Sequence, residues 1–395
     1  MNATPTYLAN KMVVETNKRL QKLPPYLFVE IDRKKAHLKS AGVDIIDFGI
    51  GDPDTPTPEF VISAMAKAIF NPEYHRYPLG RGKMLFRQAI AEWFQKRFGI
   101  IDLNPEKEIV ALLGSKEGIG HLPFAFLNPE DMALTPEPGY PVYANATILS
   151  GGMPYLLPLK KDNGFLPDLS SIPASIGNKA KIIFLNYPNN PTGAVAPDSF
   201  WKDAIGFAEK YGIILAADAA YSEIYYQEKP KSLFQFPGGK EVGIEFHSFS
   251  KTFNMTGWRL GFACGNEKII SGLSAVKENL DSGVFDAIQA AGIAALSAPE
   301  GFTEGLRQMY HKRIQILVNG LNGCGFSTQT PGGTFYLWLK IPEGNKSADF
   351  SSSLLEKFGI LTTPGIGFGP DGEGFIRFSV TLSADRIREA INRLE

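Results

Sequence analysis

The chain has 395 residues, and at about 150 residues per domain this length predicts two domains, or one large domain with an appendage. Its 40 basic and 41 acidic residues give a net charge of −1, which argues against a nucleic-acid-binding protein or a polybasic membrane protein. The 40 Gly and 28 Pro residues are more than an average chain carries, and they follow no collagen-like period.

The amino terminus is polar and lacks the apolar core of a signal peptide, and no stretch of the chain is apolar enough for a membrane span. The two cysteines, Cys264 and Cys324, cannot build a disulfide framework, and their spacing matches no metal or redox motif. We therefore expect a soluble cytoplasmic protein with free thiols and no metal, and with neither a membrane nor a nucleic acid as partner.

Short apolar runs that are typical of buried strands alternate with helix-compatible segments through the first two thirds of the chain. The strands are expected within 45–51, 108–114, 132–141, 181–193, 213–221, 242–251 and 257–265, and the helices at 59–70, 82–98, from 115 onward and at 198–210. This alternation predicts an α/β fold with a mostly parallel sheet flanked by helices on both faces.

The last third has a different pattern, with a long helix-compatible segment at 266–320 followed by two strands that alternate apolar and polar residues. These strands are expected at 331–341 and 373–382, before a final helix at 383–394. The pattern predicts a smaller α+β domain that also includes the N-terminal residues. The expected division is a large domain at 46–285 and a discontinuous small domain at 1–45 and 286–395.

The segment SFSKTFNMTGWRLG at 248–261 follows an expected strand and brings together hydroxyl groups, an amine and a guanidinium. Lys251 could act as an amine nucleophile toward an aldehyde, while Ser248, Ser250 and Arg259 could bind a phosphate of the same cofactor. Taken alone, the segment favours an ordinary surface lysine in a loop rich in hydroxyl groups.

Asp218 lies at the end of an otherwise apolar strand, where an unpaired carboxylate is costly to bury. A protonated pyridine nitrogen would compensate this charge, and the carboxylate would in turn keep the ring a strong electron sink. Tyr221 and Asn190 could reach a phenolic oxygen on the same ring. The structural alternatives are a helix N-cap for Asp218 and a turn position for Asn190.

The GSKEG segment at 114–118 occupies a strand-to-helix junction, where free backbone N–H groups favour an anion. Ser115 and the amide of Lys116 would join the hydroxyl groups of 248–250 around one phosphate. Tyr140 follows the next strand and could stack over the ring. All these segments lie at the carboxyl ends of expected parallel strands, where such sheets bind their ligands.

In their order and spacing, GSKEG, PEPGYPVY, NYPNNPTG, DAAYSEI, SFSKTFNMTGWRLG and FIRFSVTL resemble the class I/II aminotransferases, which are fold-type-I enzymes that use pyridoxal 5'-phosphate. The resemblance covers essentially the whole chain. It implies a ping-pong transfer between an amino-acid donor and a 2-oxo-acid acceptor, in a homodimer with shared active sites.

The resemblance also implies a role for each matching residue. Lys251 would bind the cofactor aldehyde and move the substrate proton. Asp218 would bind the pyridine nitrogen, Asn190 and Tyr221 would bind the ring hydroxyl, and Tyr140 would lie over the ring. The phosphate would be bound by Ser115, Lys116, Ser248, Ser250 and Arg259. Tyr77 would reach the phosphate across the dimer interface. The substrate would meet Arg377 at its α-carboxylate, together with Asn190 and the backbone of Gly51.

Two details resemble the LL-diaminopimelate aminotransferase group: the segment PPYLFVEI at 24–31 and the lysine in GSKEGI. Tyr26 and Lys116 would then hold substrate carboxylates or orient the distal end, although a packing role for Tyr26 and a solvent-facing Lys116 are equally compatible. Arg81 stands where plant-type members carry an acidic residue, so another residue would have to recognise a distal ammonium, and Glu117 and Asp281 are two candidates. Aspartate, alanine or aromatic aminotransferases remain alternatives, as does a C–S lyase.

Overall fold

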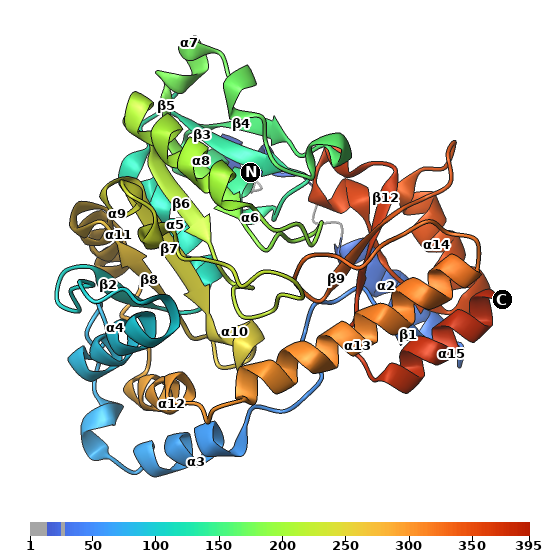
Figure 1. Ribbon diagram of the computed structural model, residues 1–395, viewed down its shortest axis with the longest axis horizontal. Helices are drawn as coiled ribbons and strands as arrows, with labels where there is room; N and C mark the ends of the chain where they lie inside the picture. The colour runs from blue at the N-terminus through green and yellow to red at the C-terminus, as the bar shows by residue number, and fades with distance from the viewer. Residues whose placement is uncertain (1–13, 25–27) are drawn as a thin grey trace, which may run out of the picture.

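A seven-stranded sheet forms the centre of the larger part of the chain in the computed structural model, which describes residues 14–24 and 28–395 (Figure 1). Its strand order is β2-β8-β7-β6-β5-β3-β4. The strands are β2 (Ile109–Leu112), β3 (Met132–Glu137), β4 (Met153–Pro158), β5 (Ala180–Asn186), β6 (Ile214–Asp218), β7 (Gly243–Ser248) and β8 (Gly261–Gly265). Strands β3 to β7 are parallel and β8 is antiparallel to both neighbours, so the predicted α/β fold is confirmed.

Both faces of this sheet are buried along its inner strands, which explains why these strands are continuous apolar runs rather than alternating ones. Ile182 and Phe184 of β5 pack in one core with α5 (Ser115–Phe126), α6 (Val142–Ser150) and α11 (Glu267–Leu280). Ile183 and Leu185 point the other way, into a core with α8 (Asp198–Tyr211). On that same side α4 (Met84–Phe98) and α12 (Asp286–Leu296) cover β2 and β8.

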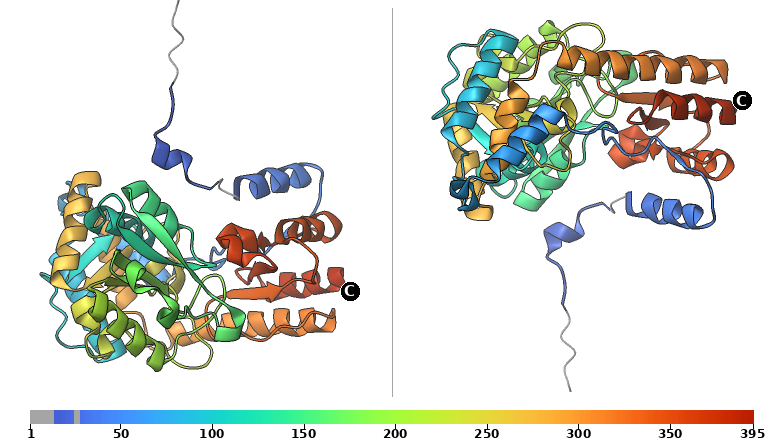
Figure 2. Two further views of the ribbon diagram at one scale, coloured as in Figure 1. Left: turned by 90° about the horizontal axis from the view of Figure 1, so that it is seen from above. Right: turned by 90° about the horizontal axis from the view of Figure 1, so that it is seen from below.

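A three-stranded antiparallel sheet organises the smaller part, seen on one side of the large sheet in Figure 2. Its order is β11-β12-β9, and β1 pairs with β10 beside it. The elements are α2 (Phe28–Ser40), β1 (Ile46–Asp47), α13 (Phe302–Gly323), β9 (Tyr336–Lys340), α14 (Ser347–Phe358), β10 (Ile360–Leu361), β11 (Thr363–Pro364), β12 (Phe375–Ser379) and α15 (Ala384–Leu394). The short helix α1 (Lys18–Gln21) contacts α6 of the larger part instead.

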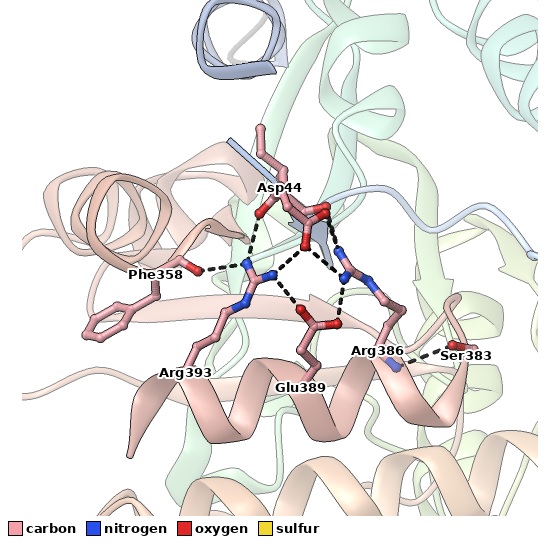
Figure 3. A network of polar contacts seen from close by, with 7 residues as sticks. Asp44, Phe358, Ser383, Arg386, Glu389 and Arg393 are labelled. Carbon is pink, nitrogen blue, oxygen red and sulfur yellow. Dashed lines mark hydrogen bonds and ion pairs between the residues drawn. The ribbon is translucent and has the colours of Figure 1, made fainter. Parts of the chain in front are cut away.

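Ion pairs join the two ends of the chain in this smaller part. Figure 3 shows Asp44, just before β1, held between Arg386 and Arg393 of α15, with Glu389 between the two guanidinium groups. Hydrogen bonds from the two arginines lower the pKa of the Asp44 carboxyl to about 2. These contacts support a small domain that is built from both ends of the chain.

The helix-compatible segment expected at 266–320 is mostly helical, and it is divided into three helices, α11, α12 and α13. Gly283 and Gly301 interrupt it with φ angles of +91° and +83°, which an L-residue side chain disfavours. Strand β1 pairs with β10 of the smaller part, which favours a first boundary later than residue 46. Helix α12 packs on α3 (Glu59–Ala68) and α4 of the larger part, which favours a second boundary later than residue 285. The division itself stays a prediction.

The remaining elements are short. They are three α-helical turns, α7 (Ala174–Gly177), α9 (Gly239–Val242) and α10 (Phe249–Thr252), and six 3-10 turns at Pro72–His75, Lys161–Asn163, Leu169–Ser171, Leu233–Gln235, Gly365–Phe368 and Pro370–Gly372. Within residues 14–24 and 28–395, no helix combines the length and the apolar character that crossing a membrane requires.

Candidate active site

The carboxyl ends of β5, β6 and β7 open on a cavity of about 920 Å³ between the large sheet and the smaller part. Most residues predicted for the site line this cavity. They are Gly51, Ser115, Lys116, Tyr140, Asn190, Asp218, Tyr221, Ser248, Ser250, Lys251, Arg259 and Arg377. The position agrees with the rule that open α/β sheets bind ligands beyond the carboxyl ends of their strands.

Two predicted residues are not placed in this cavity. Tyr77 does not line it, and its side chain is 92% exposed on the surface of the single chain. Tyr26 lies outside the residues that the structure describes. Their proposed roles therefore stay predictions.

Lys251 lies on α10, the short helix that follows β7 directly. The Ser248 side chain caps this helix by accepting a hydrogen bond from the amide of Ser250 at 3.2 Å. The Lys251 Nζ donates to the carbonyl oxygen of Gly51 at 2.8 Å. Burial lowers the pKa of the Lys251 amine from its ordinary value, so more of it is the uncharged nucleophile at neutral pH.

Asp218 is buried at the end of β6, and no Lys or Arg side chain of the described residues pairs with its carboxylate. Its Oδ2 accepts from the Tyr143 hydroxyl at 2.7 Å, and its Oδ1 accepts from the amide of Ala220 at 3.3 Å. Burial raises the pKa of this carboxyl from 3.8 to about 6. A cationic ligand group beside Asp218 would remove the cost of burying its charge.

A pH-dependent stability follows for the protein without ligand. The folded state holds the Asp218 proton more tightly than the unfolded state, so the contribution of Asp218 to the free energy of unfolding should fall as the pH rises from about 4 to about 6. A shift of about 2 pKa units corresponds to roughly 3 kcal/mol. Urea unfolding of ligand-free wild type and Asp218→Asn across this range measures it; a constant difference between the two proteins would contradict the assignment.

Arg377 lies on β12 and presents its guanidinium to the same cavity. One terminal nitrogen donates to the side-chain oxygen of Asn190 at 2.8 Å, and the other donates to the carbonyl of Gly49 at 2.8 Å. Its Nε is buried and has no hydrogen-bond partner among the described residues. This spare donor on a rigid, buried fork suits a carboxylate ligand.

An anion-binding corner forms where β2 turns into α5. Gly114 has a φ of +80°, and a Cβ on it would come within 2.5 Å of the guanidinium of Arg259. Ser115 opens α5, so the free N–H groups of that helix and the nearby arginine face the cavity together. A phosphate group has the charge that this corner favours.

Comparison with known proteins decides the family. The family model described as aminotransferase class I and II matches residues 43–394. The chain belongs to the class I and II aminotransferases.

Relatives and solved structures agree with this family over nearly the full length. The LL-diaminopimelate aminotransferases of Aquifex aeolicus and Halothermothrix orenii are 52% and 51% identical to this aminotransferase, over 96% and 97% of its chain and 98% of each relative. Substrate-bound BacF from Bacillus subtilis superposes with a TM-score of 0.93 at 38% identity, covering 96% of this chain and 97% of BacF. A Thermus thermophilus aspartate aminotransferase mutant gives 0.90 at 28% identity, with 96% and 99% covered.

Membership of this family implies dependence on pyridoxal phosphate, and the residues of the aminotransferase fit that cofactor. Asp218 is a buried carboxylate that no Lys or Arg side chain within residues 14–24 and 28–395 pairs, which suits a protonated ring nitrogen. The Lys251 amine has a lowered pKa, which suits an aldehyde. The corner at Gly114 and Arg259 suits a phosphate.

Two tyrosines of the site were not predicted from the sequence. Tyr143 contacts Asp218, and its ring stacks on Phe184 at 5.1 Å. Tyr336 lines the cavity and its ring lies 4.1 Å from the Arg377 guanidinium. Both are buried within apolar surroundings, so the sequence pattern makes them look like ordinary core residues.

The two carboxylates considered for a distal ammonium, Glu117 and Asp281, already share an internal cation. The fully buried Lys277 Nζ lies 3.0 Å from Glu117 and 3.1 Å from Asp281. Glu117 also lines the cavity and accepts from the amide of Leu113 at 3.0 Å. Arg81 instead donates to Ser274 and to two backbone carbonyls, at Glu106 and Lys107.

Lys277→Met should destabilise the aminotransferase by about 3 kcal/mol or more, because it leaves two largely buried carboxylates without their cation. Urea unfolding measures the change. Lys268→Met, at an exposed position on the same helix, is the matched control and should shift the free energy of unfolding by less than about 0.5 kcal/mol. Equal effects of the two substitutions would show that the buried pairs contribute nothing.

Proposed function

We propose that the enzyme transfers an amino group between LL-diaminopimelate and the glutamate/2-oxoglutarate pair, with pyridoxal phosphate bound at Lys251. The observation that carries this proposal is the identity of about 50% to curated LL-diaminopimelate aminotransferases over nearly the full length of both chains. The cavity supports it with the Lys251 amine, the anion corner, the Arg377 fork and the buried Asp218 carboxylate, which no Lys or Arg among the described residues pairs.

In this proposal the cofactor is held from several strand ends. Asp218 would hold the ring nitrogen, Asn190 and Tyr221 would bind the ring oxygen, and Tyr140 would cover the ring. Ser115, Lys116, Ser248, Ser250 and Arg259 would hold the phosphate in the corner that they line. When bound, pyridoxal phosphate supplies an electron sink for negative charge at the substrate α-carbon.

The protein's own groups bind the substrate and move its proton. Arg377 fixes the α-carboxylate through its fork, and Asn190 holds the fork in place at 2.8 Å. The Lys251 Nζ, with its lowered pKa, accepts the α-proton and returns it within the site. Lys116 and Tyr26 remain the proposed contacts for the distal half of the substrate.

The proposal includes a homodimer in which Tyr77 reaches the phosphate site of the partner. Large apolar side chains are exposed close to Tyr77 in the sequence, at Phe70 (85%) and Leu79 (66%), and at Leu280 (62%) at the end of α11. A Cβ on Gly283 would lie 2.7 Å from the carbonyl oxygen of Leu79, so the backbone that follows Leu280 runs beside the backbone at Leu79. Exposed apolar surface of this kind is typical of a face covered by a second copy.

The test is a comparison of amino donors with 2-oxoglutarate as acceptor, measured as glutamate formed. We expect the highest kcat/KM with LL-diaminopimelate. A higher value with aspartate, alanine or phenylalanine would assign the enzyme to one of those aminotransferase groups. Release of pyruvate and ammonia from cystathionine without any acceptor would instead assign it as a C–S lyase.

A further inference from the structure

Tyr336 lies between the residues proposed for the cofactor and the arginine proposed for the substrate. It begins β9 and is 3% exposed. In the pairing of β9 with β12 it stands opposite Ser379, two residues along the strand from Arg377. Its amide donates to the Thr334 hydroxyl at 3.0 Å, which fixes the start of the strand.

Three close contacts surround its phenol ring. The Tyr336 hydroxyl lies 3.1 Å from the Tyr221 hydroxyl. The Arg377 guanidinium lies 4.1 Å from the ring centroid, in the range of a cation–π contact. A Cβ on Gly51 would come within 1.9 Å of the phenol oxygen, so only glycine permits this approach beside the carbonyl that Lys251 contacts.

Which of the two tyrosine hydroxyls donates the hydrogen bond between them follows from the number of protons that each can donate. Each phenol has one proton to donate. If Tyr221 donates its proton to the ring oxygen of the cofactor, as proposed above, then Tyr336 must be the donor across the 3.1 Å contact. A hydroxyl that accepts a hydrogen bond is a stronger donor in its turn.

We propose that Tyr336 is a positioning residue that couples the two halves of the site: its hydroxyl strengthens Tyr221 as a donor to the cofactor, and its ring face orients Arg377 toward the substrate. This inference rests on the proposed function. The two parts of the side chain thus have separate roles, and the roles can be separated by substitution.

Other titratable and charged groups also face the Tyr336 phenol, from each element packed around it. They are Tyr221 after β6, Lys251 on α10, Arg377 on β12 and Tyr310 on α13. Tyr336→Phe leaves all of these groups in place and removes only the hydroxyl.

The experiment compares Tyr336→Phe and Tyr336→Leu in the enzyme loaded with pyridoxal phosphate. Tyr336→Phe should raise the pH midpoint of the absorption band of the lysine-bound cofactor by about 0.5 unit, because weaker donation from Tyr221 disfavours the deprotonated form. The KM for the amino donor should stay within about twofold, since the ring face is kept. Tyr336→Leu should also raise that KM about tenfold.

Tyr211→Phe, a tyrosine on α8 that is remote from the cavity, is the control and should change neither quantity. Because Tyr336→Phe keeps the ring that packs in the core, we expect this variant to fold. An unchanged pH midpoint of the cofactor band in Tyr336→Phe would overturn the coupling to Tyr221. Equal KM values for the Phe and Leu variants would overturn the role toward Arg377. A wild-type protein without any lysine-dependent cofactor band would overturn the proposed function as well.

Discussion

Lys251→Ala should reduce aminotransferase turnover by roughly 10³-fold or more, because it removes both the nucleophilic amine and the proton carrier. The amine is the only lysine nitrogen lining the cavity besides the exposed Lys116, within the part of the chain that the structure describes. The measurement is the rate of glutamate formation, together with the yield of a borohydride-reduced adduct between cofactor and protein.

Lys202→Ala, at an exposed position on α8, is the matched control for this substitution and should keep both the rate and the adduct. Retention of full activity by Lys251→Ala would contradict the account. So would an adduct that maps to another lysine.

Asp218→Asn should lower kcat/KM by about 10²-fold or more, since a neutral amide cannot stabilise a protonated ring nitrogen in a buried site. The shape of the side chain is nearly unchanged, so the cavity stays formed. The steady-state rate and the dissociation constant of pyridoxal phosphate measure the loss.

Asp203→Asn, an exposed carboxylate on α8, controls for the loss of one negative charge. It should keep wild-type kcat/KM. Wild-type kcat/KM in Asp218→Asn would show that the buried carboxylate does not act on the cofactor.

The candidate site was largely predictable from the sequence because its residues follow apolar strands directly. In parallel strands the carboxyl ends meet at one edge, so Asn190 and Asp218 had to come close to Lys251. The structure places all three along one cavity. Arg377 could be added only through the family resemblance, since nothing in a strand arginine by itself indicates a ligand.

The other site residues and the helix breaks could not be predicted, because they depend on tertiary contacts and backbone angles that a local sequence pattern does not contain. Tyr143 and Tyr336 lie in apolar segments, and only their tertiary contacts with Asp218 and Arg377 reveal a role. The breaks inside 266–320 come from single glycines whose φ angles the helical periodicity does not show. The role proposed for Tyr77, which is exposed on the single chain, requires a second copy of the chain and stays a prediction.

The most direct test of the account is a single half-reaction without any acceptor. LL-diaminopimelate, aspartate, alanine and glutamate are each mixed with the loaded enzyme, and the absorption of the lysine-bound cofactor is followed as it converts to that of pyridoxamine phosphate. The account predicts conversion with LL-diaminopimelate and with glutamate. Conversion with aspartate but not with LL-diaminopimelate would contradict it.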